Sequence, residues 1–494
     1  MISNGPSALY NQSTRARKRA GKEVVMMEQP RRIVVVGGVA GGATAASKAR
    51  RCCPQAEIEV YDQDEFISYA GCGLPYFIGG YSPNWRRLLA RLPEQFEAKQ
   101  NIRVFLRHRV NSIDPANKNI RVADLEGVSE SSIDYDRLII ATGASPFVPP
   151  LSGRELEGVF VLRSLKHALE MKSFIDMRAP QRAVIVGAGA IGLEMCEALR
   201  RLGMEVHLVE LADHVLPPLD ADLTGEVGEH LEAGGVHLHL GARVEGLEGR
   251  GGAVARVATS QGELDTEMVL LSIGIRPVSE LAQRAGIELG DRGAIRVDAA
   301  MRTSLPDILA CGDCATTRHL VSGRESWIPL GSTARKQGRA AADTVSGGEG
   351  SFPGVLGTFI LKAFELTLGK TGLSPSEASD AGFDADALTL EDSVLPGYYR
   401  GGGRMTARVT VDKVSGRILG AQVVGDYGSQ ADKRLDVFAV CTGAGLTASD
   451  LSSLDLAYAP PYSHPLDIPI VAGNLAEARI LGKECTCTME GLED

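Results

Sequence analysis

The chain has 494 residues, of which 44% are hydrophobic and 23% are charged, and a formal net charge of −10. This length predicts about three domains. The negative charge excludes bulk attraction to nucleic acid or to an anionic membrane surface, and no apolar run is long enough to span a bilayer. Nine cysteines without a recognisable secretory leader favour a reducing cytoplasm over a disulfide framework.

The first 30 residues are basic and poor in apolar side chains. They are predicted to form a disordered extension outside the fold, with Met26 and Met27 as alternative starts. A transit peptide is the alternative interpretation of this segment.

A βαβ unit is predicted over residues 32–61, with a glycine-rich turn between the first strand and the helix. The residues of this turn expected to contact a dinucleotide are Gly37, Gly38, Ala40, Gly41 and Gly42. Their backbone N–H groups and the helix dipole suit a pyrophosphate. Asp62, after the second strand, suits a ribose hydroxyl. Val39 replaces the middle glycine of the usual G-x-G-x-x-G pattern.

A second unit repeats the pattern in full register, with Gly187, Gly189 and Gly192. Two such units in one chain predict two dinucleotides. Glu210 ends the second strand of this unit. A carboxylate there accepts hydrogen bonds from a 2′-hydroxyl and repels a 2′-phosphate, so NADH is expected in preference to NADPH.

Three further motifs accompany the two glycine turns. They are Ala-Thr142-Gly143 after a buried strand, Gly274 of a G-x-x-P motif, and Gly-Asp313 after another strand. Over about residues 31–475 the order of these motifs resembles the pyridine nucleotide-disulfide oxidoreductases. The resemblance implies FAD in the first unit with Asp313 on the ribitol, NADH in the second, and a homodimer. It also assigns Val110, Leu330 and Ala334 to the flavin site.

The expected fold class is α/β, with two Rossmann-like three-layer nucleotide-binding domains and an α+β C-terminal dimerisation domain. The expected boundaries are 31–150 and 274–350 for the FAD domain, 151–273 for the NADH domain, 351–475 for the dimerisation domain, and 476–494 for a tail that carries Cys485 and Cys487.

Cys72 is the predicted redox centre. It follows the first unit and precedes a predicted helix, whose start is expected to lower the thiol pKa. The position five residues on is Phe77, so the internal C-x4-C disulfide of dithiol relatives is absent. Electrons must then reach a mixed disulfide, a persulfide or a sulfenic acid on Cys72. The alternative is that Cys72 is a small buried core residue.

Residues 68–76, which read SYAGCGLPY, resemble the coenzyme A disulfide reductases and the related coenzyme A-binding persulfide reductases. Residues 455–467, which read DLAYAPPYSHPLD, are a second match to the same group. In that group, tyrosines of the partner subunit approach the active cysteine, a role that falls here on Tyr458 and Tyr398. A phenol beside a leaving thiolate suits a proton donor. The alternative is that Tyr458 only packs in a core.

Coenzyme A brings phosphates and requires polar and basic contacts. The residues expected to bind it are Arg50, Arg51, Ser68, Lys433, Arg434, Tyr462 and His464. For the basic residues the alternative is a solvated surface charge. Gly71 stands where many members of the group have asparagine, so that side-chain contact is missing.

Several other functions compete. Peroxidase relatives carry a histidine in the first glycine turn where this chain has Ala40, which disfavours peroxide reduction. The rival enzyme is an oxygen-reducing NADH oxidase, and a flavin-bearing redox sensor that uses Cys485 and Cys487 is a third hypothesis. A thiol shuttle by these two cysteines, comparable to that of mercuric reductases, is a further one.

No metal site is expected. Cys311 and Cys314 have C-x-x-C spacing, but the glycine and aspartate between them are assigned to flavin. His237 and His239 lie on one face of a predicted strand and are interpreted as a surface pair. Cys196 and Cys441 fall in apolar helical patterns and are interpreted as core.

Overall fold

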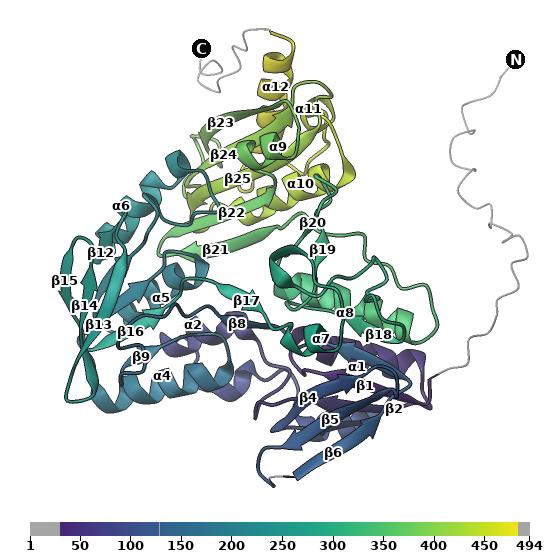
Figure 1. Cartoon of the computed structure of the whole chain (residues 1–494). Helices are drawn as coiled ribbons and strands as arrows, with labels where there is room; N and C mark the ends of the chain where they lie inside the picture. The colour runs from purple at the N-terminus through teal and green to yellow at the C-terminus, as the bar shows by residue number, and fades with distance from the viewer. Residues whose placement is uncertain (1–29, 128, 483–494) are drawn as a thin grey trace, which may run out of the picture.

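The computed structural model describes residues 30–127 and 129–482. The predicted N-terminal extension, apart from its last residue, and the two tail cysteines therefore lie outside the described residues. Three bodies make up the molecule, with the C-terminal sheet above the two parallel sheets in Figure 1.

The first body is a parallel five-stranded sheet in the order β18-β7-β1-β2-β3. Its strands are β1 (Arg32–Val36), β2 (Glu57–Tyr61), β3 (Ile102–Phe105), β7 (Arg137–Ile140) and β18 (Ile308–Ala310). One face packs on α1 (Ala40–Cys52), α3 (Pro93–Gln100) and α8 (Gly331–Val345), and the other on the antiparallel strands β4 (His108–Asp114), β5 (Asn119–Asp124) and β6 (Ser129–Asp134).

Alternation along β1 explains these two faces. Ile33 and Val35 join the core under α1 and α8, whereas Val34 and Val36 join the core under β4–β6, as the two-residue period of a strand requires. Helices α1 and α8 cross at glycines, since a Cβ atom on Gly338 would lie 2.4 Å from the Gly41 carbonyl oxygen.

The second body has the strand order β12-β11-β10-β16-β9, again all parallel. Its strands are β9 (Val159–Phe160), β10 (Arg182–Val186), β11 (Glu205–Val209), β12 (Val236–His239) and β16 (Met268–Leu271). One face packs on α4 (Leu165–Arg178), α5 (Ala190–Arg201) and α6 (Gly225–Ala233), and the other on β13 (Val244–Arg250), β14 (Ala253–Thr259) and β15 (Gly262–Asp265).

The chain leaves the first body and returns to it through a two-stranded antiparallel crossing. β8 (Ala144–Pro146) pairs there with β17 (Ile275–Pro277), directly after Gly274. The short elements that follow are α7 (Glu280–Arg284), β19 (Thr317–Arg318) and β20 (Glu325–Ser326).

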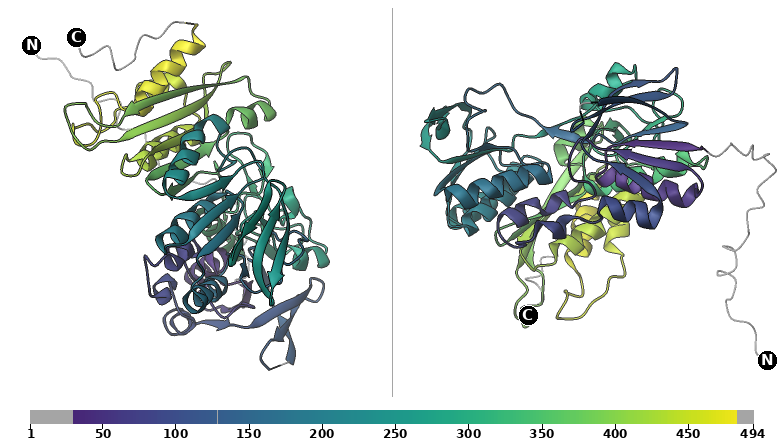
Figure 2. Two further views of the ribbon diagram at one scale, coloured as in Figure 1. Left: turned by 90° about the vertical axis from the view of Figure 1, so that its left-hand side faces the viewer. Right: turned by 90° about the horizontal axis from the view of Figure 1, so that it is seen from below.

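The third body is an antiparallel sheet in the order β21-β22-β25-β24-β23, visible at the top of both Figure 1 and the left view of Figure 2. Its elements are β21 (Phe359–Ala363), β22 (Leu366–Gly372), α9 (Pro375–Asp380), β23 (Ala385–Ser393), β24 (Arg404–Asp412), β25 (Ile418–Asp426), α10 (Ala431–Ala444), α11 (Ala448–Ser452) and α12 (Ile468–Ile480). The predicted tail boundary at residue 476 is wrong, because Ala476 is buried in the middle of α12.

Ion pairs join the second and third bodies. Arg408 of β24 contacts Asp220 at 2.8 Å and Asp222 at 2.5 Å. Glu197 of α5 accepts from Lys362 Nζ at 2.7 Å and from the backbone N–H of Phe364 at 2.9 Å. These charge-assisted bonds fix how the C-terminal sheet sits on the body that carries α5.

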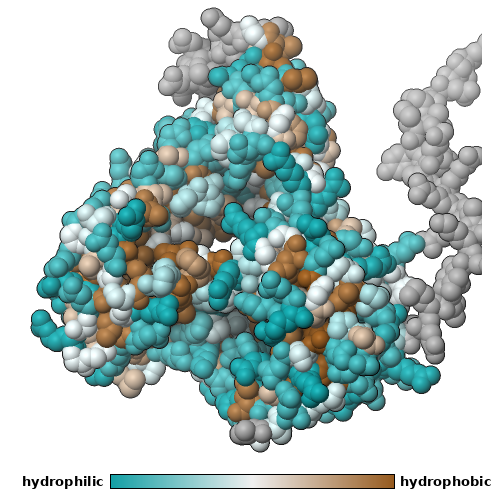
Figure 3. Space-filling model, viewed as in Figure 1, coloured by the Kyte–Doolittle hydropathy of each residue, from teal (hydrophilic) through white to brown (hydrophobic). Residues whose placement is uncertain are grey.

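The predicted fold class is confirmed: two doubly covered parallel sheets are followed by an antiparallel sheet with helices. Among the described residues, no helix is long and apolar enough to cross a membrane. The face of the molecule seen in Figure 3 is largely hydrophilic, with apolar residues gathered around a hollow between the first two bodies.

Candidate active site

In the first glycine loop (37–42), the backbone at Gly37 and Gly42 lies so close to neighbouring backbone that side chains would not fit there. Gly37 has a φ of +101°, and a Cβ atom there would lie 2.2 Å from the Ala141 carbonyl oxygen. A Cβ atom on Gly42 would lie 1.8 Å from the Gly37 oxygen. The start of α1, at Ala40, has no side-chain cap. Its first N–H groups are therefore available to a phosphate.

The second glycine loop (187–192) repeats this geometry at the start of α5. Gly187 has a φ of +103°, and a Cβ atom on Gly192 would lie 2.0 Å from the Gly187 oxygen. A Cβ atom on Gly189 would meet no atom within 4 Å, so this position leaves open space beside the helix start. The two loops thus share the close strand-to-helix turn that is typical of dinucleotide sites, and they differ in the middle position, which is Val39 in the first and Gly189 in the second.

Each loop is braced by the carboxylate predicted to hold a ribose. Asp62 accepts from the N–H of Gly38 at 2.7 Å, and burial raises the pKa of Asp62 to about 6. Glu210 accepts from the N–H of Ala188 at 2.6 Å and from that of Ala212 at 2.9 Å. A carboxylate has about four lone-pair sites, so each still has capacity for ribose hydroxyls.

Asp313 fits a flavin ribitol. Its Oδ1 is buried and has no hydrogen-bond partner within the described chain, while Oδ2 pairs with Arg163 at 2.5 Å. A buried carboxylate oxygen without a donor is costly, and a ribitol hydroxyl would supply one. Ala334 of α8 lies beside Gly312, at 3.6 Å from a Cβ built there.

The remaining residues assigned to flavin lie around this position. Leu330 immediately precedes α8. Thr142 donates to the Val278 carbonyl at 2.5 Å, and Gly143 accepts from the Val278 N–H at 2.9 Å. The Val110 side chain is buried in the core under β4–β6, which leaves only its backbone for a ligand.

Cys72 lies in a single 3-10 turn (Gly71–Gly73) directly before α2 (Leu74–Ile78). Leu74, Phe77 and Ile78 are buried in the core that contains α4 and α5, so they anchor the turn. Cys72 itself is exposed, whereas the other described cysteines are buried or partly buried. The core-residue interpretation of Cys72 is therefore wrong, and that of Cys196 and Cys441 is confirmed.

A cavity of about 230 Å³, here called the arginine cavity, adjoins the segment that leads to Cys72. It is lined by Val39, Ala40, Ala43, Thr44, Ser47, Arg51, Ser68, Tyr69, Ala90, Arg91, Phe96 and Arg335. Arg51 and Arg335 have no hydrogen-bond or ion-pair partner within the described residues. Arg91 donates to Ser47 at 3.2 Å. Three guanidinium groups thus share one cavity, an arrangement suited to phosphate.

Two arginines assigned to coenzyme A from the sequence have other roles. Arg50 donates to the carbonyl oxygens of Gln100, Cys53, Pro54 and Asn101 at 2.7–3.3 Å. Arg434 is buried, and it pairs with Asp467 at 2.8 Å and donates to two carbonyl oxygens. Both guanidinium groups stabilise local structure, so we do not assign them to a phosphate.

The C-terminal site residues lie on the surface of the third body. Tyr398 is 76% exposed, Tyr458 47% and Tyr462 64%. A hydrogen bond with Tyr398 raises the pKa of Tyr458. His464 Nε2 lies 3.3 Å from the Ser393 hydroxyl, and Lys433 is exposed and paired with Asp432 and Asp436. Exposed tyrosines on this body are available to a second subunit.

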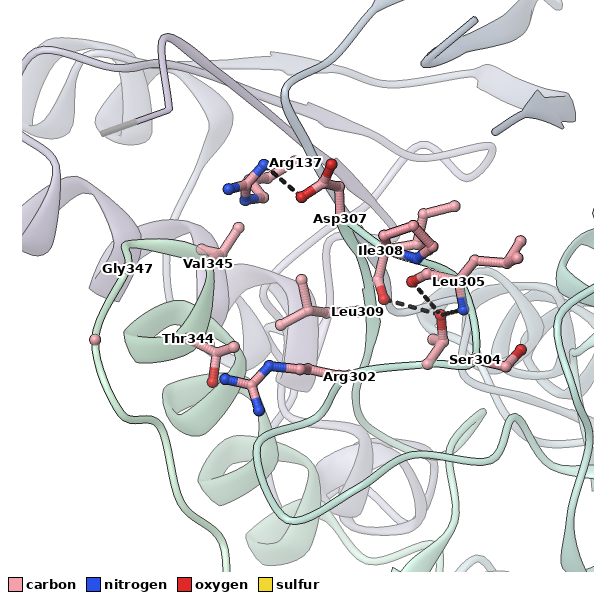
Figure 4. Close-up of a pocket in the computed structure, with 13 residues that line it drawn as sticks. Arg137, Arg302, Ser304, Leu305, Asp307, Ile308, Leu309, Thr344, Val345 and Gly347 are labelled. Carbon is pink, nitrogen blue, oxygen red and sulfur yellow. Dashed lines mark hydrogen bonds and ion pairs between the residues drawn. The ribbon is translucent and has the colours of Figure 1, made fainter. Parts of the chain in front are cut away.

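A larger cavity of about 380 Å³ lies elsewhere on the first body (Figure 4). Arg137 begins β7 and pairs with Asp307, which precedes β18. The cavity therefore opens at the amino ends of these parallel strands. Nucleotides bind at the carboxyl ends, so this cavity is separate from the site.

Comparison with known proteins identifies the family. The model of the pyridine nucleotide-disulphide oxidoreductases matches residues 31–338, and that of the dimerisation domain of the same family matches residues 359–467. The chain belongs to this family. The predicted resemblance is confirmed, and this oxidoreductase uses FAD and a nicotinamide nucleotide.

Individual relatives span nearly the whole oxidoreductase. NAD(P)H coenzyme A polysulfide/persulfide reductase of Pyrococcus horikoshii is 37% identical over 86% of this chain and 93% of its own length. Coenzyme A disulfide reductase of Staphylococcus epidermidis is 31% identical over 87% and 95%. NADH oxidase of Methanocaldococcus jannaschii is 32% identical over 82% and 90%.

A solved structure of a relative is similar over most of the chain. Reduced Bacillus anthracis CoADR-RHD superposes with a TM-score of 0.89 at 37% identity, and the match covers 92% of this oxidoreductase and 81% of that chain. The similarity therefore extends over all three bodies.

Sequence reasoning missed several residues of this site. Arg91, Arg163 and Arg335 reach it only through tertiary packing. Glu194 of α5 was also missed, although it follows the second glycine loop by two residues. Burial, followed by the charge of Glu197, raises the pKa of Glu194 to about 7. The pKa of Tyr76, on the helix after Cys72, is raised by burial and then by the charge of Glu194.

Glu194→Gln is expected to change how stability depends on pH. A folded-state pKa of about 7, above the ordinary value of 4.5, means that the folded chain binds the proton more tightly. The contribution of Glu194 to wild-type stability should therefore be lost as pH rises from 5 to 8. The neutral glutamine removes this loss, so the melting temperature of the variant should gain on wild type over that interval. The exposed control Glu229→Gln should track wild type throughout, and a Glu194→Gln curve parallel to wild type would contradict the assignment.

Proposed function

We propose that this oxidoreductase uses NADH to reduce coenzyme A disulfide, or coenzyme A persulfide and polysulfide, through Cys72. The observation that carries the proposal is the exposed Cys72 four residues after Ser68, which lines the arginine cavity. The names of the relatives support the same substrate class.

The arginine cavity is the proposed binding site for the phosphates of coenzyme A. Arg51 lies on α1, Arg335 on α8, and Ser68 and Arg91 on the intervening loops. Ser68 has a φ of +51°, and its backbone is held by the Gly38 oxygen at 2.9 Å and by the Ala90 N–H at 2.7 Å. The left-handed backbone at Ser68 and its two hydrogen bonds fix the position of the segment that links the arginine cavity to Cys72.

The proposed reaction balances as NADH plus a proton plus coenzyme A disulfide to NAD⁺ plus two coenzyme A thiols. The Cys72 thiolate attacks one sulfur, the substrate disulfide breaks, and one coenzyme A leaves as a thiolate that takes up a proton. When bound, FAD and NADH supply the two electrons that cleave the mixed disulfide on Cys72 and release the second coenzyme A. With a persulfide, hydrosulfide leaves first instead.

The proton donor is proposed to be Tyr458, paired with Tyr398, from the partner subunit of a homodimer. The matched dimerisation domain supports this assembly. Both phenols are exposed on the third body, whereas α2 lies in the lower half of the molecule (Figure 1). Glu210 supports NADH as the preferred nucleotide, because its carboxylate would repel a 2′-phosphate.

NADH oxidation by the purified protein tests the proposal directly. Coenzyme A disulfide, coenzyme A persulfide, polysulfide and hydrogen peroxide are offered in turn under anaerobic conditions, and air is then admitted as the last acceptor. The highest rate is expected with a coenzyme A substrate or polysulfide. The highest rate in air would favour the NADH oxidase alternative, which the relative of that name supports, and would overturn the coenzyme A assignment.

Arg335→Ala is expected to raise the KM for coenzyme A disulfide by about 10- to 100-fold, since a charge-assisted hydrogen bond contributes roughly 1.5–3 kcal/mol. The KM for polysulfide, which has no phosphates, should be unchanged in steady-state assays. Lys336→Ala is the matched control, because Lys336 is the exposed neighbour on α8 that does not line the cavity. An equal effect of both variants on both substrates would show that the cavity does not hold the phosphates.

A further inference from the structure

Three histidines and a glutamate gather on one face of the parallel sheet of the second body. Glu205 and His207 lie on β11, and His237 and His239 lie on β12, the terminal strand of its sheet. His207 and His237 are register partners. Residues two apart on a strand share a face, so all four side chains lie together, opposite the core residues of the same strands.

The distances among these side chains approach those of a metal site. Glu205 Oε1 lies 3.2 Å from His207 Nε2 and 3.7 Å from His237 Nε2. One ligand atom from each of these three residues lies within 4.8 Å of the others. Ligands bound to zinc at 2.0–2.2 Å in a tetrahedron are about 3.3 Å apart. His237 is 56% exposed and has room to turn the remaining distance.

His239 supplies the outer contact that metal-binding histidines usually have. Its Nε2 lies 3.0 Å from His207 Nδ1, so the ring nitrogen of His207 that faces away from Glu205 is already hydrogen-bonded. Such a bond fixes the tautomer and the ring orientation of the ligand. The adjacent cation, Arg182 on β10, is paired with Glu267 at 3.2 Å and with Asp265 at 3.9 Å.

We propose that Glu205, His207 and His237 bind one zinc-like divalent cation, with His239 as the positioning residue. Two imidazole nitrogens and one carboxylate oxygen are a ligand set that zinc uses, with a fourth position open to water. The site is separate from the proposed reaction at Cys72 and does not depend on it. It departs from the interpretation of His237 and His239 as a simple surface pair, because β11 adds two ligands that no local motif reveals.

Calorimetric titration of the FAD-loaded full chain with zinc chloride tests the proposal. The parent protein carries Cys72→Ser, Cys485→Ser and Cys487→Ser, so that exposed and tail thiols do not bind the metal. One equivalent of zinc per chain is expected. His237→Gln should abolish this binding, and His239→Gln should weaken it about 10- to 100-fold, as loss of an outer-shell contact does.

His230→Gln on α6 is the matched control and should bind zinc as the parent does. A second measurement is thermal unfolding: zinc should raise the melting temperature of the parent and of His230→Gln, and not that of His237→Gln. Flavin content shows that each variant is folded. No binding at tenfold excess of zinc, or equal binding by the parent and His237→Gln, would overturn the proposal.

Discussion

Cys72→Ser is expected to lower turnover of coenzyme A disulfide or persulfide by at least about a thousandfold. A hydroxyl is not ionised near neutral pH and forms no mixed disulfide, so covalent catalysis at this position is lost. The fold should not change, because the Cys72 side chain is exposed and the turn is held by buried Leu74, Phe77 and Ile78. Steady-state NADH oxidation with each substrate measures the effect.

Reduction of the bound flavin by NADH is the internal control for this variant, since that half-reaction does not use the thiol. It should proceed at the wild-type rate in anaerobic stopped-flow experiments. Cys52→Ser is the matched cysteine control, because Cys52 lies at the end of α1 and is only partly exposed. Full turnover by Cys72→Ser would remove the cysteine from the mechanism and leave only the flavin and nicotinamide sites.

Gly42→Ala is expected to abolish FAD binding and to lower stability by about 3 kcal/mol or more, at the upper end of overpacking costs. The new Cβ atom would lie 1.8 Å from the Gly37 carbonyl oxygen and 3.2 Å from the Ala141 side chain. The first clash is with backbone, which no side-chain rotation relieves. The first glycine loop must then move away from the position in which it meets the pyrophosphate.

Flavin absorbance of the purified protein and thermal unfolding check this prediction. Gly71→Ala is the matched control, because a Cβ atom at Gly71 meets no atom within 4 Å. It should retain FAD and the wild-type melting temperature. A Gly42→Ala protein that purifies with full flavin content would show that the loop tolerates the extra atom.

Local motifs were sufficient to predict the two parallel sheets and to single out Cys72 among the cysteines. A glycine loop between a strand and a helix requires a particular backbone path, and the structure gives Gly37 and Gly187 positive φ values of +101° and +103° at these two turns. The positions of Asp62 and Glu210 were also predictable, because each follows the second strand of its unit, and each carboxylate accepts a hydrogen bond from the backbone of its glycine loop.

Residues that reach the site across the fold could not be predicted in this way. Arg335 enters the arginine cavity from α8, far along the chain from Arg51, and Arg163 crosses between bodies to Asp313. Conversely, the sequence predicted that Arg50 and Arg434 bind phosphate. In the structure Arg50 donates to backbone carbonyl oxygens and Arg434 pairs with Asp467. A basic residue in a sequence does not reveal which acceptors the fold places beside it.

The crossing of α1 and α8 at Gly41 and Gly338 also bears on how the chain is made. Strand β18 and helix α8 complete the first sheet and its cover, yet both follow the entire second body in the sequence. On the ribosome, the first sheet therefore emerges without its last strand and with part of the α1 surface uncovered. The second body emerges whole and can fold first. The flavin pocket is then a late product of synthesis, closed by long-range contacts whose loop entropy makes them slow to form.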